Sequence, residues 1–496
     1  MKQIFQDLKT KKISIEELPD LIVKDGCVLV QTHYSVISSG TEKTIIDTAS
    51  KNLLQKAHAR PDLVKQVVSK VRNDGILSTY HSVLDRLDTP IPLGYSASGV
   101  VIDVGNNVSN FNVGDRVAIA GAGYANHATI NCVPEKLVVK IPKNVSLHNA
   151  AYVTIGSIAM QGVRVAKPQI GEYVAVSGLG LVGLTTAMIL KANGCMVCGI
   201  DLDQKKINLA KELGLDQVIN LKDNNVEQLI NDFSSGRGVD HTIICASTDS
   251  DSPITLAGDI TKSKGVVTIV GTVGMDIPRQ PFYLKELELR LSMSYGPGRY
   301  DKSYEEMGHD YPYNYVRWTE NRNMSSIINL IASENLDFSK ITTHNYKYVS
   351  AIEAYEKIKG KEFFVGIVLD YDIQSIDSNY EPISKMYISK GSHKINEEIK
   401  LGFIGLGNYA SSKLIPTLKK NKNVEFIGLA NSRGISSKNK ANKFNFSYFS
   451  ANYNEIIADK DINTIFISTR HSNHFELSKL SLELNKNVFV EKPPCI

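Results

Sequence analysis

The stretch VAVSGLGLVGLTTAMILKANG, residues 174–194, decides how the middle of this chain folds. An apolar run ends at Gly178-x-Gly180-x-x-Gly183, and a helix-forming segment follows directly. The first glycine allows a tight bend, the second lets the backbone approach a diphosphate, and the third lets helix and strand pack closely. Backbone N–H groups at the helix start, together with the helix dipole, favour bound phosphates. The pattern therefore predicts a dinucleotide-binding strand–turn–helix unit.

The segment after this helix supports the same interpretation. The apolar run CMVCGID ends at Asp201, about 18 residues past Gly183. A carboxylate there accepts hydrogen bonds from both ribose hydroxyls and repels a 2′-phosphate, so NAD is favoured over NADP. The strand candidates EYVAVSG, MVCGIDL, HTIICAS and GVVTIVG alternate with helix candidates over residues 151–290. Such alternation predicts a parallel, doubly wound sheet.

A second unit of this type begins at IKLGFIGLG near the end of the chain. Its turn reads Gly405-x-Gly407-x-x-Ala410, and alanine at the last position still allows close packing. The next strand candidate, EFIGLAN, is followed by Ser432-Arg433 instead of an acid. Arg433 could pair with a 2′-phosphate, or it could be a solvated surface charge. We therefore expect NAD or NADP at this second site, and the arginine favours NADP.

Composition narrows the class of protein. The chain has 496 residues, 42% hydrophobic and 22% charged, which predicts a globular protein of two to four domains. A formal net charge of +4 with dispersed charges argues against a nucleic-acid binder. We see no secretory signal and no apolar run long enough for a membrane span. Six scattered cysteines suit a reducing compartment, so we expect a cytoplasmic protein without a membrane partner.

The pattern along the chain predicts an α/β protein with several domains. Residues 1–150 are β-rich, and residues 291–370 return to a mixed pattern that completes this domain. Residues 151–290 form the first nucleotide-binding domain, and residues 371–397 are polar and weakly periodic, as expected of a linker. Residues 398–496 form the second nucleotide-binding domain.

Residues 1–370 resemble the medium-chain, zinc-type alcohol dehydrogenase superfamily. The resemblance is carried by four stretches: SSGTE at 38–42, PLGYSASGVVIDVGNNVSNFNVGDRV at 92–117, IGEYVAVSGLGLVG at 170–183 and GRGVDHTIICAS at 236–247. It implies a GroES-like β-rich domain joined to a Rossmann domain, and an oxidoreductase activity.

The zinc-binding positions of that superfamily are replaced in this chain. Zinc-containing members have Cys and His where this chain has Ser39 and Tyr95, and the four-cysteine structural lobe is missing. Because zinc needs about four ligands, we expect no catalytic zinc and no metal site. Another group must then polarise a carbonyl, and Tyr95 is the candidate donor, with Ser39 beside it. The alternative is that Tyr95 is a packed pocket aromatic.

Residues 400–496 resemble the nucleotide-binding domain of the Gfo/Idh/MocA family. The motifs are GFIGLGNYA at 402–410 and ISTRHSNHFELSKLSLELNKNVFVEKP at 467–493. The resemblance implies that Lys492 is catalytic and stabilises alkoxide character as hydride leaves a sugar carbon. It places Glu491 near the cofactor and makes His471 and His474 pocket candidates. A lysine that ends a strand can also be simply solvated.

Two further observations bear on the substrate. The Gfo/Idh/MocA substrate domain should follow Pro493, so we interpret the chain as a fragment; completion by another chain or a vestigial half are alternatives. The fusion and the stretch at 294–324 resemble two-domain oxidoreductases encoded with bacterial surface-polysaccharide genes. In that stretch Tyr295, Arg299, Tyr300 and Arg317 could bind a sugar or its phosphates, or form an inter-domain contact.

The leading hypothesis is a zinc-independent NAD(P)-dependent oxidoreductase that acts on a carbonyl or secondary alcohol. We expect the substrate to be a sugar or sugar nucleotide, and the chain to form a homo-oligomer. A cofactor-binding regulatory or scaffold protein with decayed catalytic groups is the second hypothesis. A quinone or enone reductase is the third.

Overall fold

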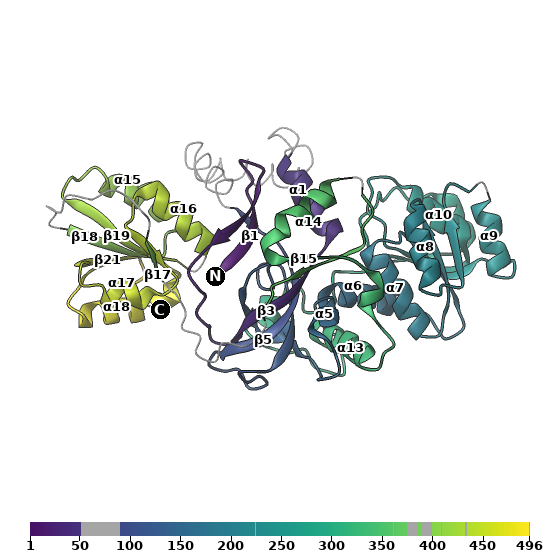
Figure 1. Ribbon diagram of the computed structural model, residues 1–496, viewed down its shortest axis with the longest axis horizontal. Helices are drawn as coiled ribbons and strands as arrows, with labels where there is room; N and C mark the ends of the chain where they lie inside the picture. Colours follow the sequence, from purple (N-terminus) through teal and green to yellow (C-terminus); the bar gives the residue numbers. More distant parts are fainter. Residues whose placement is uncertain are drawn as a thin grey trace.

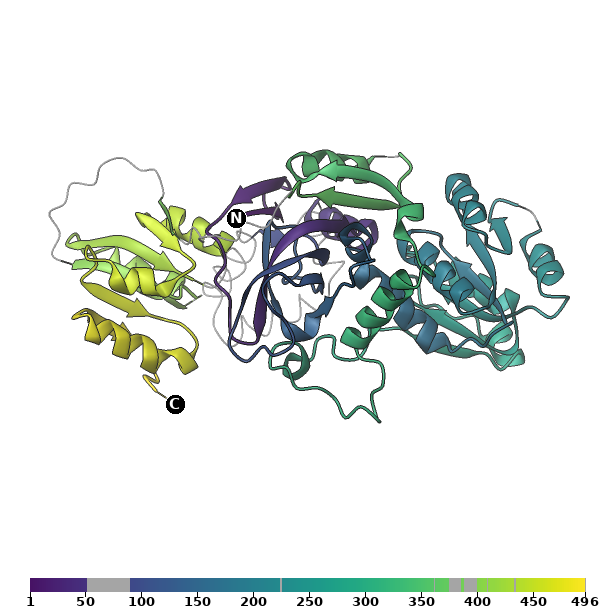
Figure 2. The same cartoon turned by 60° about the horizontal axis from the view of Figure 1, so that its bottom comes forward.

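The computed structural model describes residues 1–50, 90–223, 225–360, 362–373, 385–387, 399–407, 409–431 and 434–495 (Figure 1). Two α/β sheets, one parallel throughout and one parallel except for an edge strand, lie at opposite ends of the molecule, with the β-rich domain between them (Figures 1 and 2). None of the helices in the described part of the chain is long and apolar enough to cross a membrane.

The β-rich domain is built around β3 (Cys27–Ile37), a strand rich in Val, Ile and Thr that suits a half-buried sheet. Its seven-stranded sheet has the order β15-β16-β3-β5-β6-β8, and β7 also pairs with β3. The other strands are β5 (Ser96–Val104), β6 (Arg116–Ala120), β7 (Ile130–Pro134), β8 (Val138–Lys140), β15 (Thr342–Lys347) and β16 (Gly366–Asp370). A small sheet of β1 (Lys2–Gln6), β2 (Ile13–Glu17) and β4 (Ile91–Pro92) lies beside it.

The chain returns to this domain after the first nucleotide-binding unit. Strand β16 pairs antiparallel with β3, Val368 opposite Val36, so residues 366–370 belong to the N-terminal sheet. The helices described in and beside this domain include α1 (Ser39–Ser50), α5 (Leu147–Ala150), α12 (Lys302–Glu305) and α14 (Ala351–Lys359). The two parts of the domain are therefore held together by main-chain hydrogen bonds across one sheet.

The first nucleotide-binding unit contains the predicted doubly wound sheet. Its six strands are all parallel, in the order β11-β10-β9-β12-β13-β14. The strands are β9 (Tyr173–Ser177), β10 (Met196–Asp201), β11 (Gln217–Asn220), β12 (Val239–Ile244), β13 (Thr261–Ile269) and β14 (Glu288–Leu291). Helices α7 (Leu181–Ala192), α8 (Gln204–Glu212), α9 (Val226–Phe233), α10 (Ser252–Ile260) and α11 (Arg279–Leu284) connect them. This order is that of the Rossmann fold, which binds dinucleotides where the strand order reverses, beside the first strand.

Helices α6 (Val153–Ala166) and α13 (Glu320–Ala332) join the two domains. They pack against each other, and ten of the fourteen residues of α6 are buried. One hydrophobic core runs from the β-rich sheet through α6 to α7. The two domains are therefore joined by a continuous apolar core.

The C-terminal unit is a second sheet of six strands, in the order β17-β20-β19-β18-β21-β22. The strands are β18 (Ile399–Ile404), β19 (Val424–Ala430), β20 (Tyr448–Ser450), β21 (Thr464–Ile467) and β22 (Asn487–Val490), with β17 (Lys385–Tyr387) at the edge. A π-helical turn (Ala410–Leu414) leads into α15 (Ile415–Leu418), and α16 (Gly434–Phe444), α17 (Tyr453–Ala458) and α18 (His474–Glu483) complete the unit. All pairs are parallel except β17–β20.

Strand β17 differs from the sequence-based expectation, because residues 385–387 lie inside the predicted linker 371–397. They pair antiparallel with β20, with Met386 opposite Phe449. The strand is three residues long and lies in a polar stretch, so it gives no periodic signal. Part of the expected linker therefore belongs to the C-terminal sheet.

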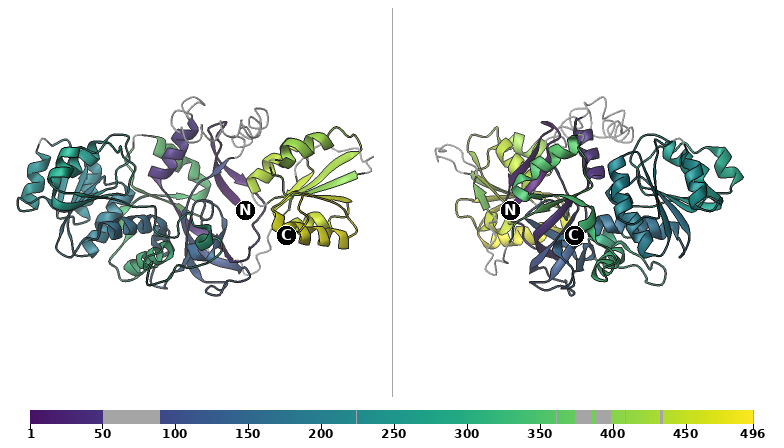
Figure 3. Two further views of the ribbon diagram at one scale, coloured as in Figure 1. Left: turned by 180° about the vertical axis from the view of Figure 1, so that it is seen from behind. Right: turned by 45° about the vertical axis from the view of Figure 1, so that its right-hand side comes forward.

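The C-terminal unit contacts the N-terminal hairpin through α16 (Figures 1 and 3). Lys438 Nζ donates to Glu16 Oε2 at 2.7 Å, and Ile435 packs with Phe5 and Leu18. Burial raises the pKa of Glu16, but its hydrogen bonds to Lys438 and Ser14, together with the positive charge of Lys438, lower the pKa overall. The contact combines a half-exposed ion pair with a small apolar cluster.

Candidate cofactor and active site

The first glycine turn has the geometry that a bound diphosphate requires. Gly178 has a φ of +93°, and a Cβ there would lie 2.6 Å from the backbone nitrogen of Ala246. A Cβ on Gly183 would overlap the carbonyl oxygen of Gly178, so only glycine lets α7 pack this close. Gly180 is the N-cap of α7, and a Cβ there would meet nothing within 4 Å. The turn is therefore tight where helix meets strand and open where a phosphate approaches.

Asp201 lies at the end of β10 and faces this turn. Its Oδ2 accepts a hydrogen bond from the backbone N–H of Leu179 at 2.7 Å, and its Oδ1 accepts from Asp203 N at 2.9 Å. Lys206 Nζ lies 3.8 Å away. The carboxylate is thus fixed beside the turn, where it fits the ribose hydroxyls of NAD and opposes a 2′-phosphate.

The second glycine turn repeats part of this geometry. Gly405 has a φ of +80°, and a Cβ there would lie 2.8 Å from the carbonyl oxygen of Ser468. Ser468 Oγ donates to the Gly405 carbonyl at 2.5 Å. Gly407 faces open space, and Ala410 is fully buried where the helix begins. The residues present fit a dinucleotide here as well.

The charge around the second turn differs from that around the first. Strand β19 ends at Ala430, and the half-buried Asn431 follows where the first unit has its acid. Arg433 lies outside the described residues, so its predicted role stays a prediction. The ammonium of Lys440, on α16, donates to the carbonyl oxygen of Leu406 within the turn. The sequence analysis missed Lys440, because only the fold brings α16 to the turn.

Tyr95 lies in the core between the two domains. Its hydroxyl donates to Ser38 Oγ at 2.6 Å, and Thr154 Oγ1 donates to its carbonyl oxygen at 3.0 Å. Burial raises the pKa of the Tyr95 phenol, so the group stays protonated and can only act as a neutral donor. Ser39 is the first residue of α1, and its side chain lies outside what the structure describes.

A buried polar network fixes the turn that carries Ser38 and Ser39. Glu42 is 1% exposed, and its Oε1 accepts from Ser38 N at 3.0 Å and lies 3.2 Å from His127 Nε2. Tyr355 donates its hydroxyl to Glu42 Oε2 at 2.6 Å. These partners lie 85 and 313 residues from Glu42 in the sequence, which is why no local motif indicated them.

The Glu491-Lys492-Pro493 turn follows β22. Glu491 is half-buried and Lys492 is exposed at the carboxyl end of this strand. His474 is fully buried, with Nδ1 2.8 Å from the Pro493 carbonyl oxygen and Nε2 3.2 Å from that of Thr469. His474 therefore joins the turn of Lys492 to the loop after β21, on the sheet edge that carries the glycine turn.

The stretch at 294–324 places the four predicted sugar contacts in different surroundings. Tyr295 is 3% exposed, whereas Tyr300 is 70% exposed. Arg299 donates to Glu305 Oε1 at 2.7 Å, and its guanidinium lies 4.2 Å from the ring centre of Tyr300. The Arg317 guanidinium lies 3.7 Å from the ring centre of Trp318.

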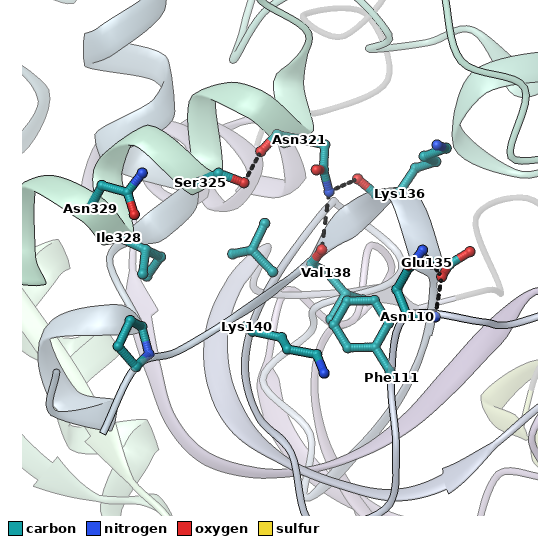
Figure 4. Close-up of a pocket in the computed structure, with 12 residues that line it drawn as sticks. Asn110, Phe111, Glu135, Lys136, Val138, Lys140, Asn321, Ser325, Ile328 and Asn329 are labelled. Carbon is teal, nitrogen blue, oxygen red and sulfur yellow. Dashed lines mark hydrogen bonds between the residues drawn. The ribbon is translucent and has the colours of Figure 1, made fainter. Parts of the chain in front are cut away.

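A pocket with a cavity volume of about 350 Å³ lies between β8 and α13 (Figure 4). Asn321 reaches across its edge and donates through Nδ2 to the carbonyl oxygens of Lys136 at 2.8 Å and Val138 at 3.0 Å. None of the residues that line it belongs to the predicted cofactor or catalytic sets. We therefore assign it no part in cofactor binding.

Family models match segments of both the dehydrogenase unit and the C-terminal unit. Residues 63–143 match the alcohol dehydrogenase GroES-like domain, and residues 182–309 match a family described as zinc-binding dehydrogenase. Residues 399–496 match the oxidoreductase family with an NAD-binding Rossmann fold, Gfo/Idh/MocA. The expected α/β class, with a GroES-like domain and two Rossmann domains, is confirmed.

Two similar proteins each match more than half of the chain. A D-xylulose reductase of Scheffersomyces stipitis is 28% identical over 322 residues, which cover 57% of this chain and 84% of that protein. Human sorbitol dehydrogenase is 24% identical over 301 residues, 54% of this chain and 77% of the human protein.

Solved structures show the same fold. A 2R,3R-butanediol dehydrogenase from Bacillus subtilis superposes with a TM-score of 0.55 and 20% identity, covering 75% of this chain and 99% of the other. A galactitol-1-phosphate dehydrogenase from Escherichia coli gives a TM-score of 0.57 at 17% identity, covering 75% of this chain and all of the other.

The expectation that the chain works without zinc is wrong, because residues 182–309 match the zinc-binding dehydrogenase family. That expectation rested on the replacements at Ser39 and Tyr95, but a ligand set of about four can include other residues. Within the described ranges, no three or more His, Cys, Asp or Glu side chains are placed to hold a metal ion. His58 and His81 belong to the stretch 51–89, outside those ranges. We therefore assign no zinc ligand and derive no chemical step through a metal.

The glycine turns, the strand orders and the family matches lead to one conclusion. The chain joins a medium-chain alcohol dehydrogenase unit to a Gfo/Idh/MocA nucleotide-binding domain, and it belongs to the NAD(P)-dependent oxidoreductases.

Proposed function

We propose that the dehydrogenase unit transfers a hydride between NAD(H) and the carbinol carbon of a polyol or the matching ketose. The observation that carries this proposal is the first glycine turn, open at Gly180 and flanked by the carboxylate of Asp201. The names D-xylulose reductase and sorbitol dehydrogenase among similar proteins support a sugar alcohol as the substrate class.

The chain's own residues bind and orient the reactants. Backbone N–H groups at Gly180 and the start of α7 hold the diphosphate, and Asp201 holds the ribose. The bound nicotinamide supplies or accepts the hydride. We propose that the Tyr95 hydroxyl gives up its hydrogen bond to Ser38 Oγ when substrate binds and donates instead to the substrate oxygen, with Ser39 beside it. The Glu42 network holds this turn in one position.

Absorbance at 340 nm with NAD and xylitol or sorbitol tests this function. We expect turnover by the full chain, and we expect Tyr95→Phe to lose most of it while NAD affinity stays unchanged. Full activity of Tyr95→Phe would contradict the role of this hydroxyl. Cofactor binding without turnover on any polyol, ketose, enone or sugar nucleotide would contradict the enzyme proposal and favour a scaffold.

For the second unit we propose that it binds NAD or NADP, with Glu491 beside the cofactor and the Lys492 ammonium next to the nicotinamide. The exposed position of Lys492 at the strand end supports this.

A sugar nucleotide of surface-polysaccharide synthesis is the second substrate candidate. The exposed side chains of Arg317 and Tyr300 favour this candidate, since a guanidinium pairs with phosphate and an aromatic ring can pack against a sugar. Turnover of UDP-sugars but not of polyols would select this candidate.

We also propose that the chain forms a homo-oligomer. Light scattering after size-exclusion chromatography measures the molar mass and tests this.

A further inference from the structure

Polar atoms without partners gather in one part of the dehydrogenase unit. Of the sixteen buried side-chain nitrogen and oxygen atoms that lack a hydrogen-bond partner in the described residues, six belong to the stretch 292–323. They include the Tyr295 hydroxyl, both carboxyl oxygens of Glu320 and Oδ1 of Asn323. Glu320 and Asn323 are fully buried. Since proteins leave few such atoms unpaired, this group needs an occupant that supplies hydrogen bonds.

These side chains lie beyond the carboxyl ends of β13 and β14. Asn323 Nδ2 donates to Gln161 Oε1 at 3.1 Å and to the Tyr295 carbonyl at 2.9 Å. Gly162, next to Gln161, packs against Val270, the residue that directly follows β13. Tyr295 follows β14 by four residues. In open parallel sheets, ligands bind outside the carboxyl ends of the strands.

The charges in this group cancel. Arg299 pairs with Glu305 at 2.7 Å, and their side chains are 12% and 7% exposed. Burial, with the neighbouring charge of Glu305, raises the pKa of Glu320 to about 9, so Glu320 is neutral at physiological pH. The unpaired atoms are donors, such as the Tyr295 hydroxyl, and acceptors, such as Asn323 Oδ1. Hydroxyl groups both donate and accept, whereas an anion would need an uncompensated cation.

We propose that Tyr295, Glu320 and Asn323, with the Arg299–Glu305 pair, form a subsite for the hydroxyl groups of a neutral polyol or sugar. We call these five residues the Glu320 cluster. The inference rests on the proposed function, because it supplies the part of the substrate pocket that recognises hydroxyls away from the reacting carbon. Since the unpaired atoms are closed off from solvent, residues 296–319, which run between Tyr295 and α13, must move for the substrate to enter.

The fluorescence of Trp318 tests this subsite without needing turnover. Trp318 is the single tryptophan of the chain and lies two residues from Glu320. We expect xylitol and sorbitol to change its fluorescence in a saturable way in the full chain. Tyr295→Phe and Glu320→Leu should each weaken binding about tenfold, since each leaves substrate hydroxyls unpaired. Glu320→Gln, which keeps a donor and an acceptor, should stay within about threefold of the parent. The matched control is Tyr315→Phe, at a side chain 89% exposed, which should bind like the parent.

Two results would overturn the subsite. One is the absence of a saturable response to either polyol; the other is equal affinity in Glu320→Leu and the parent. A higher melting temperature of Glu320→Leu with unchanged binding would show that the cluster holds water only. Failure of the proposed function looks different, because polyols would then change the fluorescence of Trp318 without reducing NAD. Oxidation of polyols with the same KM in Glu320→Leu and the parent would be the second of these results seen in turnover, and it would leave the proposed function intact.

Discussion

The two glycine turns share a backbone and differ in charge. Gly178 and Gly405 both have positive φ, and Gly180 and Gly407 both face open space. The first turn is held by the carboxylate of Asp201, whereas the ammonium of Lys440 contacts the second. The backbone thus suits a diphosphate in both units, and we expect the charge beside each turn to select between NAD and NADP. We expect changes to the backbone to have larger effects than changes to these charges.

The largest expected effect comes from filling the open side of each turn. Gly180→Val should lower NAD affinity of the first unit about 100-fold or more, because its side chain takes the place of the diphosphate. Its melting temperature should stay near that of the parent, since no atom lies within 4 Å of a Cβ there. Gly407→Val is the matched change in the second unit. Calorimetric titration measures both, and loss of both sites by one change would contradict independent units.

Asp201→Ala should reverse the cofactor preference of the first unit. The loss of two hydrogen bonds to the ribose should lower the affinity for NAD about 30-fold. Removal of the negative charge should raise the affinity for NADP. Titration of the Gly407→Val background with NADH and NADPH isolates this site. An unchanged ratio of the two affinities would show that Asp201 acts only through its bond to Leu179.

We expect Glu320 to make the stability of the dehydrogenase unit depend on pH, and not that of the C-terminal unit. Its folded-state pKa of about 9 lies above its ordinary value of 4.5, so folding takes up a proton and stability falls as pH rises between these values. Glu320→Gln lacks this loss and should melt about 5 °C above the parent at pH 9, with no gain at pH 4. Scanning calorimetry measures this difference. A difference in melting temperature between Glu320→Gln and the parent that stays constant across pH would contradict an uncharged Glu320 carboxyl in the folded protein.

The smallest expected effect belongs to Lys440. Lys440→Met removes a charge at the second turn but leaves its backbone in place, so dinucleotide affinity of that unit should fall only about threefold. High salt should reduce the difference between parent and variant, since screening weakens the charge. A loss as large as that of Gly407→Val would show that Lys440 holds the turn together.

The sequence predicted what depends on neighbouring residues and missed what the fold brings together. Both glycine turns and Asp201 follow from one strand–turn–helix pattern, and the structure places them accordingly. His127 and Lys440 gave no signal, because their partners are distant in the chain. Glu320 begins α13, where an acid is ordinary on a helix, and only packing shows it to be buried and unpaired.

The number of dinucleotides bound per chain tests the central claim most directly. Titration of the full chain with a mixture of NADH and NADPH in equilibrium dialysis should approach two bound dinucleotides per chain. Gly180→Val and Gly407→Val should each reduce this to one. A parent chain that binds one dinucleotide, with no change in Gly407→Val, would contradict a second working site.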